Sequence, residues 1–233
     1  LRSRGGDTQW YALIGDPVQQ SIGHIYHNEC FQREGIDAVY FKMRVERAQL
    51  AAFFRGVSQL PFRGFSVTMP LKEAVMDYVQ TPLSIGSMNT LSCHDGVIDA
   101  INTDGEAAIT VIEQRCSIAG RRVLVLGAGG ASRAIVYALS LRGAQVTVMN
   151  RTLEKAEALQ RDMSIVVLEY LAVPLETYDI VINALAPVAY ERGALLDWLR
   201  AVIATATVVL DINYHGATEI LKAMVELVGV DYI

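Results

Sequence analysis

Between residues 123 and 143 the chain passes from an apolar run through a cluster of glycines into a helical pattern. Val123–Leu126 has no polar side chain, as expected of a strand buried on both faces of a parallel sheet. The segment Gly127-Ala128-Gly129-Gly130 permits a tight turn, a helix follows through Arg142, and Gly143 is placed to end it. This order of strand, glycine turn and helix predicts a βαβ unit, and it constrains the fold more than any other feature.

The same alternation extends over the chain and predicts an α/β protein with parallel strands and right-handed crossovers. The expected strands are Trp10–Ile14, Ala38–Met43, Phe65–Thr68, Val123–Leu126, Val146–Met149, Ile165–Leu168, Ile180–Ile182 and Val208–Leu210. The expected helices outside the glycine segment are His24–Glu34, Ala48–Val57, Leu71–Tyr78 and Leu153–Asp162. A boundary between two halves is expected near Ile101–Gly105, where two polar turns precede a new helix.

Composition excludes several classes of protein. Hydrophobic residues make up 52% of the 233 residues, too many for a disordered polymer. Apolar runs such as Ala201–Leu210 fall short of the ~18–20 residues that cross a bilayer, so we expect no membrane span. The net charge of −5, from 20 basic and 25 acidic residues, argues against a nucleic-acid partner.

The cysteines and the amino-terminal segment predict a cytoplasmic location. Cys30, Cys93 and Cys116 form no C-x-x-C pair, and an odd number of thiols is no disulfide framework. The polar segment Leu1–Gln9 lacks the apolar core of a signal peptide and reads as a linker. We also expect no metal site, because the four histidines lack ligand spacing with carboxylates or thiols: His24, His27, His94 and His215.

The glycine segment predicts a dinucleotide site, because backbone N–H groups and a helix N-terminus suit a pyrophosphate. Ser132 stands where the fingerprint has its third glycine, and a merely tight turn is the alternative. The residues expected to bind the cofactor here are Gly127, Ala128, Gly129, Gly130, Ala131 and Ser132.

The end of the next strand favours NADP over NAD. An NAD site carries Asp or Glu there for the ribose 2′-hydroxyl, whereas this chain has Asn150-Arg151-Thr152 and then Lys155. A guanidinium can bind a 2′-phosphate through paired hydrogen bonds. The alternative is an ordinary helix cap at Thr152 with Arg151 in solvent.

Polar residues in the first half indicate a second site. Lys72 is expected on the first turn of a helix, where the dipole disfavours a cation and thereby favours proton transfer. The alternative is a solvated lysine paired with Glu73 or Asp77. Asp104 either caps the following helix or orients Lys72 as a carboxylate–ammonium pair.

Several motifs, in one order over about residues 10–220, resemble those of the shikimate dehydrogenases. The motifs are Gly15-Asp16-Pro17-Val18-x-x-Ser21-x-Gly23-His24, Val67-Thr68-Met69-Pro70-Leu71-Lys72-Glu73, Asn89-Thr90-Leu91, Asn102-Thr103-Asp104-Gly105, Gly127-Ala128-Gly129-Gly130-Ala131-Ser132-Arg133, Asn150-Arg151-Thr152 and Asp211-Ile212-Asn213-Tyr214. The resemblance implies an N-terminal α/β substrate domain and a C-terminal Rossmann-like NADP-binding domain that face each other across a cleft.

The resemblance also implies reversible hydride transfer between NADPH and 3-dehydroshikimate, giving shikimate for aromatic amino acid biosynthesis. It implies that Lys72 is the catalytic acid/base, with Asp104 as its partner and a substrate ligand. Ile212 corresponds to a position whose main chain touches the nicotinamide end of the cofactor. The implied substrate-binding positions are Ser21, Gly23, Thr68, Asn89, Asp104 and Tyr214.

The expected domains are residues 1–101, with 1–9 as a linker, and residues 102–213 for the cofactor. Residues 214–233 are expected to return to the substrate domain. Gly23 replaces a family serine whose hydroxyl binds the substrate carboxylate, so quinate is an alternative substrate. Asn183-Ala184-Leu185-Ala186 replaces the family's Asn-Ala-Thr-Ser, and the family's glutamine-bearing last helix is absent from this sequence.

Three further possibilities stay open at this point. The sequence begins with Leu1 and not with Met, which suggests that it is a module fused behind a 3-dehydroquinate dehydratase. A non-catalytic NADP-binding module would not need Lys72 and Asp104. An enzyme weakened by the missing last helix would bind NADP but have poor affinity for its substrate.

Overall fold

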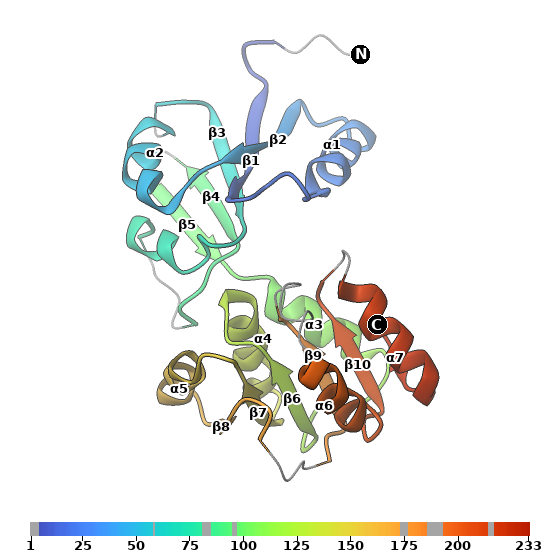
Figure 1. Cartoon of the computed structure of the whole chain (residues 1–233). Coiled ribbons are helices and arrows are strands. Elements are labelled where there is room, and N and C mark those ends of the chain that lie inside the picture. Colours follow the sequence, from blue (N-terminus) through green and yellow to red (C-terminus); the bar gives the residue numbers. More distant parts are fainter. Residues whose placement is uncertain are drawn as a thin grey trace. The chain divides into compact units, whose positions relative to one another are not determined.

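The computed structural model describes residues 5–57, 59–80, 85–94, 97–172, 177–185, 193–213 and 217–233. The chain divides into two compact units, Leu1–Thr103 and Asp104–Ile233. Figure 1 shows the first unit in blue to green and the second in green to red. The division falls inside the segment Ile101–Gly105, where the sequence places a boundary.

The first unit is built on one sheet with the strand order β2-β1-β3-β4-β5. Its strands are β1 (Gln9–Gly15), β2 (Ala38–Arg44), β3 (Phe62–Val67), β4 (Thr90–His94) and β5 (Val97–Ile101). β1 lies between β2 and β3 and is parallel to both, while β4 and β5 add antiparallel at the edge. The three parallel strands were expected from sequence, whereas the β4–β5 pair was not.

Helical segments cover both faces of this sheet. They are α1 (Gly23–Arg33), η1 (Arg47–Gln49), α2 (Leu50–Val57) and η2 (Ala74–Tyr78), of which η1 and η2 are 3₁₀ helices. Along β1, Ala12 and Ile14 pack in the core that holds α2 and η2, and Leu13 packs in the small core with Phe31 of α1. This alternation of side chains is the period of two that a strand imposes.

The predicted helix over Leu71–Tyr78 is wrong in its type and its start. The structure has a short 3₁₀ helix that begins at Ala74, and Lys72 lies in the turn before it. The carbonyl of Lys72 accepts a hydrogen bond from the Met88 N–H at 2.8 Å, so this turn is held by the segment that precedes β4. The dipole of a regular α-helix therefore does not act on Lys72.

The second unit is a parallel sheet with the strand order β11-β10-β9-β6-β7-β8. Its strands are β6 (Arg122–Leu126), β7 (Gln145–Met149), β8 (Val166–Leu168), β9 (Ile180–Asn183), β10 (Val208–Asp211) and β11 (Asp231–Tyr232). Its helices are α3 (Asp104–Glu113), α4 (Gly130–Leu141), α5 (Leu153–Asp162), α6 (Gly193–Ile203) and α7 (Ala217–Val228). This is a Rossmann-like order, in which the sheet starts at β6 and grows to either side.

Both faces of the sheet are buried, as the apolar run at Val123–Leu126 predicts. Val123 and Val125 pack in the core that holds α3, α4 and α5, and Leu124 and Leu126 pack in the core that holds α6 and α7. No helix among the described residues is long and apolar enough to cross a membrane.

The carboxyl-terminal segment was expected to return to the first unit, and this prediction is wrong for residues 217–233. Leu221 and Val225 of α7 are fully buried in the core that α7 shares with α6. β11 pairs in parallel with β10, and the Asp211 N–H donates to the Ile233 carbonyl at 3.0 Å. The apolar face of α7 is therefore buried within the second unit.

The contact between α3 and α4 requires a glycine at position 105. A Cβ atom there would lie 2.5 Å from the Ala134 carbonyl oxygen and 3.0 Å from the Ala138 Cβ. Since the first of these atoms belongs to the backbone, it cannot move aside cheaply. The absence of a side chain at Gly105 thus sets the distance between the two helices.

We expect Gly105→Ala to lower the free energy of unfolding by about 1–3 kcal/mol, because the added methyl group overpacks the helix contact. Urea denaturation of the full chain measures this. Gly56→Ala is the control, since a Cβ at Gly56 in α2 meets no heavy atom of the described residues within 4 Å. Equal stability of the two variants would contradict the prediction.

Candidate functional site

The glycine loop after β6 has a backbone that only glycine adopts readily at its first position. Gly127 has φ of +108°, in the left-handed region, and its N–H donates to the Met149 carbonyl at 2.8 Å. A Cβ at this position would lie 2.8 Å from the Ala184 carbonyl oxygen. The loop after β6 is therefore in close contact with the loop after β9.

The start of α4 offers unpaired backbone donors to an anion. Gly129 is the N-cap in an extended conformation, makes no side-chain cap hydrogen bond and is exposed. A Cβ at Gly129 would meet nothing within 4 Å among the described residues. Since the first N–H groups of a helix lack intrahelical acceptors, this 12-residue helix presents donors and a positive dipole end. These residues fit the pyrophosphate of a dinucleotide.

Ser132 faces the protein rather than the open side of the loop. Its side chain is 1% exposed, and its Oγ lies 3.2 Å from where a Cβ of residue 127 would be. The hydroxyl thus fills the narrow space between α4 and the glycine loop, where the fingerprint has its third glycine. Only the backbone of Ser132 is placed to meet a ligand.

The sheet topology also locates a crevice at this loop. The strand order reverses between β6 and β9, since the chain proceeds from β6 to β7 on one side and returns to β9 on the other. In open α/β sheets, ligands bind outside the carboxyl ends of the strands at such a switch point. Gly127 and Ala184 follow β6 and β9 directly, so the glycine loop lies at the switch point.

The residues after β7 lie beside this loop at the carboxyl edge of the same sheet. Asn150 donates from Nδ2 to the Thr152 carbonyl at 2.7 Å and thereby shapes the turn into α5. Thr152 is the N-cap of α5, but its side chain makes no cap hydrogen bond. Arg151, Thr152 and Lys155 are exposed. Thr152 is therefore the N-cap residue that the alternative interpretation places there, although without a side-chain cap hydrogen bond, and the cationic side chains of Arg151 and Lys155 are exposed to solvent.

In the first unit, backbone hydrogen bonds bring three motifs together at the carboxyl end of β3. The Thr68 N–H donates to the Ile14 carbonyl at 2.9 Å, and the Asp16 N–H donates to the Met69 carbonyl at 3.0 Å. The Val67 N–H donates to the Asn89 carbonyl at 2.7 Å. Thr68, Lys72 and Asn89 thus come from segments that are hydrogen-bonded to one another.

Asn89 and Thr103 form a second set of bonds in this cluster. Asn89 donates from Nδ2 to the Thr103 hydroxyl at 2.9 Å, and its Oδ1 accepts the Thr103 N–H at 3.0 Å. Asn102 donates from Nδ2 to the Ser87 carbonyl at 2.9 Å. The two polar turns at Ser87–Asn89 and Asn102–Thr103 therefore meet, which their separation in sequence could not establish.

Ser21 and Gly23 lie at the start of α1. The Gly23 N–H donates to Oγ of Ser21 at 3.4 Å, and Lys42 donates from Nζ to the Gln19 and Ser21 carbonyls at 2.8 and 3.2 Å. The nearest atom to a Cβ at Gly23 would be Oγ of Ser21, at 3.6 Å. This position has room for the serine that the family carries.

The remaining predicted residues are placed as follows. Asp104 is the first residue of α3, in the second unit, and its pairing with Lys72 stays a prediction. Ile212 follows β10, and its N–H donates to the Asn183 carbonyl at 3.1 Å. Tyr214, together with Ala186 and residues 1–4 of the expected linker, lies outside the described residues.

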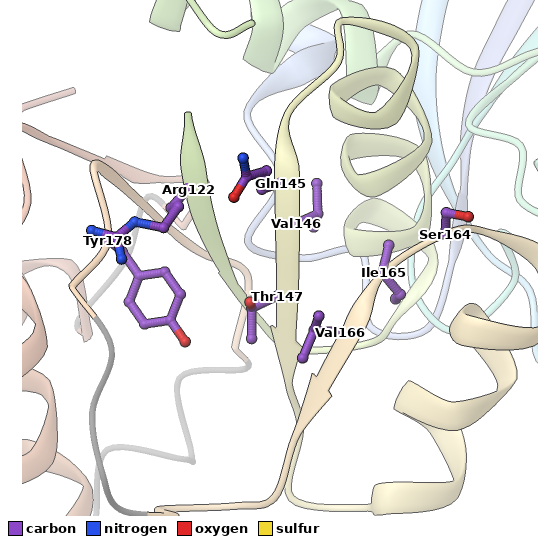
Figure 2. A pocket seen from close by; sticks show the side chains of 8 residues that line it. All are labelled: Arg122, Gln145, Val146, Thr147, Ser164, Ile165, Val166 and Tyr178. Carbon is purple, nitrogen blue, oxygen red and sulfur yellow. The ribbon is translucent and has the colours of Figure 1, made fainter. Parts of the chain in front are cut away.

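A cavity of about 350 Å³ lies at the opposite, amino-terminal edge of the second sheet. Figure 2 shows Arg122 and Tyr178 on one side of it and Ser164 and Ile165 on the other. Thr147 of β7 lies between them. The cavity is separated from the glycine loop by the length of the strands, and sequence analysis did not single out its residues.

The described residues hold three free thiols and no cluster of side chains with metal-ligand chemistry. The three cysteines are free thiols, and burial raises the pKa of Cys93 to about 11, so its thiol stays protonated at neutral pH. No group of three or more His, Cys, Asp or Glu side chains in the described ranges is arranged to hold a metal ion.

Comparison with known proteins assigns this geometry to a family. A model described as the shikimate dehydrogenase substrate binding domain matches residues 13–91. A second, described as shikimate / quinate 5-dehydrogenase, matches residues 110–212. A solved shikimate dehydrogenase in complex with NADP⁺ is 29% identical, with a TM-score of 0.85 over 99% of this chain and 85% of that one.

Curated relatives agree with these matches. The shikimate dehydrogenase (NADP⁺) of Pyrococcus furiosus is 37% identical over 222 residues, which are 93% of this chain and 80% of that protein. The shikimate biosynthesis protein AroDE of Chlamydia pneumoniae is 38% identical over 188 residues, or 76% of this chain, but the match covers 38% of that longer protein. The chain belongs to the shikimate dehydrogenase family.

Proposed function

We propose that this protein catalyses the reversible, NADP-dependent reduction of 3-dehydroshikimate to shikimate. The observation that carries the proposal is the glycine loop at the switch point of the second sheet, with Gly127 at φ of +108° and exposed Arg151 after the adjacent strand. Membership of the shikimate dehydrogenase family supplies the substrate class, which the fold by itself does not define.

The cofactor is held, in this proposal, by residues at the carboxyl edge of the second sheet. The main-chain N–H groups of residues 128–132 bind the pyrophosphate, and Gly127, whose own N–H is bonded to Met149, forms the turn that presents them. Arg151 and Lys155 bind the 2′-phosphate, and Asn150 and Thr152 shape the turn beneath it. The main chain at Ile212 contacts the nicotinamide end. When bound, NADPH supplies the hydride that reduces the carbonyl carbon of the substrate.

Lys72 acts as the general acid of the reduction. As the carbonyl is reduced, negative charge develops on its oxygen, and the Lys72 ammonium donates a proton to that oxygen. In the reverse direction the neutral amine accepts the proton of the substrate hydroxyl. Asp104 orients Lys72 and binds the substrate. Ser21, Thr68, Asn89 and Tyr214 hold the ring hydroxyls and the carboxylate, beside the open position at Gly23.

Two wider proposals concern the setting of the enzyme. The similarity to the longer AroDE protein favours fusion to a 3-dehydroquinate dehydratase, and we place the enzyme in the cytoplasm. The reading frame of the intact transcript tests this, because a dehydratase must be encoded upstream of Leu1. A binding module without catalysis is the rival, and the polar cluster around Lys72 and Asn89 speaks against it.

We expect Lys72→Ala to lower kcat with shikimate and NADP⁺ by about 10²- to 10⁴-fold, since the proton transfer loses its acid and base. The dissociation constant for NADP⁺, measured by fluorescence titration, should stay unchanged. Lys222→Ala removes an exposed lysine of α7 and serves as the control. A Lys72→Ala variant with wild-type turnover would exclude this residue as the proton donor.

We expect Arg151→Ala to raise KM for NADP⁺ by about tenfold or more and to leave KM for NAD⁺ nearly unchanged, because only NADP⁺ carries the 2′-phosphate. Steady-state kinetics with both cofactors measure the ratio. Arg161→Ala, at the exposed end of α5, is the matched control. A wild-type preference for NAD⁺ would overturn the role given to Arg151.

Gly23 is expected to set the preference between shikimate and quinate. Gly23→Ser adds a hydroxyl for the substrate carboxylate in a space that is open, and we expect kcat/KM for shikimate to rise about tenfold. The ratio of kcat/KM for shikimate to that for quinate measures the preference. Gly23→Ala fills the same space without a hydroxyl, and an equal gain in this control would refute the explanation.

A further inference from the structure

A polar network joins the two loops that follow β9 and β10. Asn183, the last residue of β9, is fully buried and donates from Nδ2 to Oδ1 of Asp211, the last residue of β10, at 2.8 Å. Its own Oδ1 accepts the Leu185 N–H at 3.3 Å. One amide side chain therefore bonds to the neighbouring strand and to its own following loop.

The Asp211 carboxylate also accepts hydrogen bonds from Asn213 and Tyr232. Oδ1 accepts the Asn213 N–H at 3.0 Å and Nδ2 of Asn213 at 3.1 Å, and Nδ2 also donates to the Leu185 carbonyl at 3.0 Å. Tyr232 of β11 donates from its hydroxyl to Oδ2 at 3.4 Å. Burial and the nearby Asp211 charge raise the pKa of Tyr232, so its hydroxyl stays protonated as a donor.

These bonds begin where the backbone ladder ends. The register of β9 and β10 runs to the pair Asn183 and Asp211, and the Ile212 N–H makes the last bond across, to the Asn183 carbonyl at 3.1 Å. Beyond that point, the side chains of Asn183, Asp211 and Asn213 connect residues 184–185 with residues 212–213. Fixing both loops in this way needs a buried amide and a carboxylate, which cost more to desolvate than an apolar pair.

The position of the network in the sheet suggests its purpose. A dinucleotide on this fold places one half over each side of the switch point, and the glycine loop with Arg151 lies on the side of β6 and β7. The loops after β9 and β10 lie on the other side, beneath the half that reacts. Ala184 also contacts the backbone at Gly127, so a shift of the loop after β9 would displace the glycine loop at the switch point.

We propose that Asn183 and Asp211 are positioning residues for hydride transfer, which hold the backbone at 184–185 and 212–213 against the reactive half of the cofactor. This inference rests on the proposed function. Neither side chain touches the substrate in this scheme. They act through the loops, and a small displacement of the reacting groups is enough to slow a transfer that depends on alignment.

The test compares two variants of the full chain. Asn183→Leu keeps the approximate volume but removes the bonds to Asp211 and Leu185. Asp211→Asn keeps an acceptor oxygen toward Asn183 and Asn213, and its amide can donate to the Tyr232 oxygen. We expect Asn183→Leu to lower kcat by about 10- to 100-fold and Asp211→Asn to stay within about threefold of the wild type.

Affinities separate positioning from a loss of structure. Adenosine 2′,5′-bisphosphate probes the adenine half alone, and we expect Asn183→Leu to bind it as the wild type does. The ratio of NADP⁺ affinity to bisphosphate affinity should fall about fivefold or more, because the reactive half loses its support. Thr147→Val, which alters another buried polar residue of the same sheet, should change neither kcat nor this ratio.

Two outcomes would overturn the inference. One is an Asn183→Leu variant with wild-type kcat and an unchanged affinity ratio. The other is an equal loss of both affinities together with a lower melting temperature, which marks a purely structural role. If the wild-type chain turned over no shikimate with NADP⁺, the proposed function would fail, while the affinity ratio would still decide whether these residues position the bound dinucleotide.

Discussion

The approach of Gly127 to the Ala184 carbonyl is the constraint on which the second unit depends. Since no side chain can stand between them, the loops after β6 and β9 meet at the point where the strand order reverses. That contact aims the start of α4 at the carboxyl edge of the sheet, and Ser132 fills the space beneath. The proposed diphosphate site is thus a consequence of backbone packing, because its donors are the main-chain N–H groups at the start of α4.

Local patterns predicted the strands β6 to β10 and the helices α3, α4 and α5 of the second unit, but not α6, α7 or β11. The helix Leu153–Asp162 was expected over the residues that it occupies, and the strand runs were within a residue or two of their observed bounds. The 3₁₀ helix at Ala74–Tyr78 was mistaken for an α-helix, because the sequence does not reveal that the Lys72 carbonyl is bonded by Met88. The prediction that residues 214–233 return to the first unit was wrong for residues 217–233, because a sequence pattern does not specify which sheet a segment packs against.

The candidate site also has a part that sequence predicts and a part that only the folded chain shows. The glycine loop and Arg151 come directly after strands of one sheet. Once the strands are predicted from the sequence, the positions of these residues at the edge of the sheet follow. The bonds of Asn89 to Thr103 and of Asn183 to Asp211 join residues 14 and 28 positions apart. No period or motif encodes such contacts, although Asn183 and Asp211 both stood in stretches that resemble the family. Their importance to each other required the folded chain.

The turn after β7 has a consequence for how such proteins change over time. A side chain at Gly127 or Gly105 would clash with neighbouring backbone atoms, so substitution at either position lowers stability. Arg151 and Lys155 stand in solvent and take no part in the core. With Arg151 and Lys155 in the proposed role, a few substitutions at exposed positions would change the cofactor preference in evolution without any change in the core.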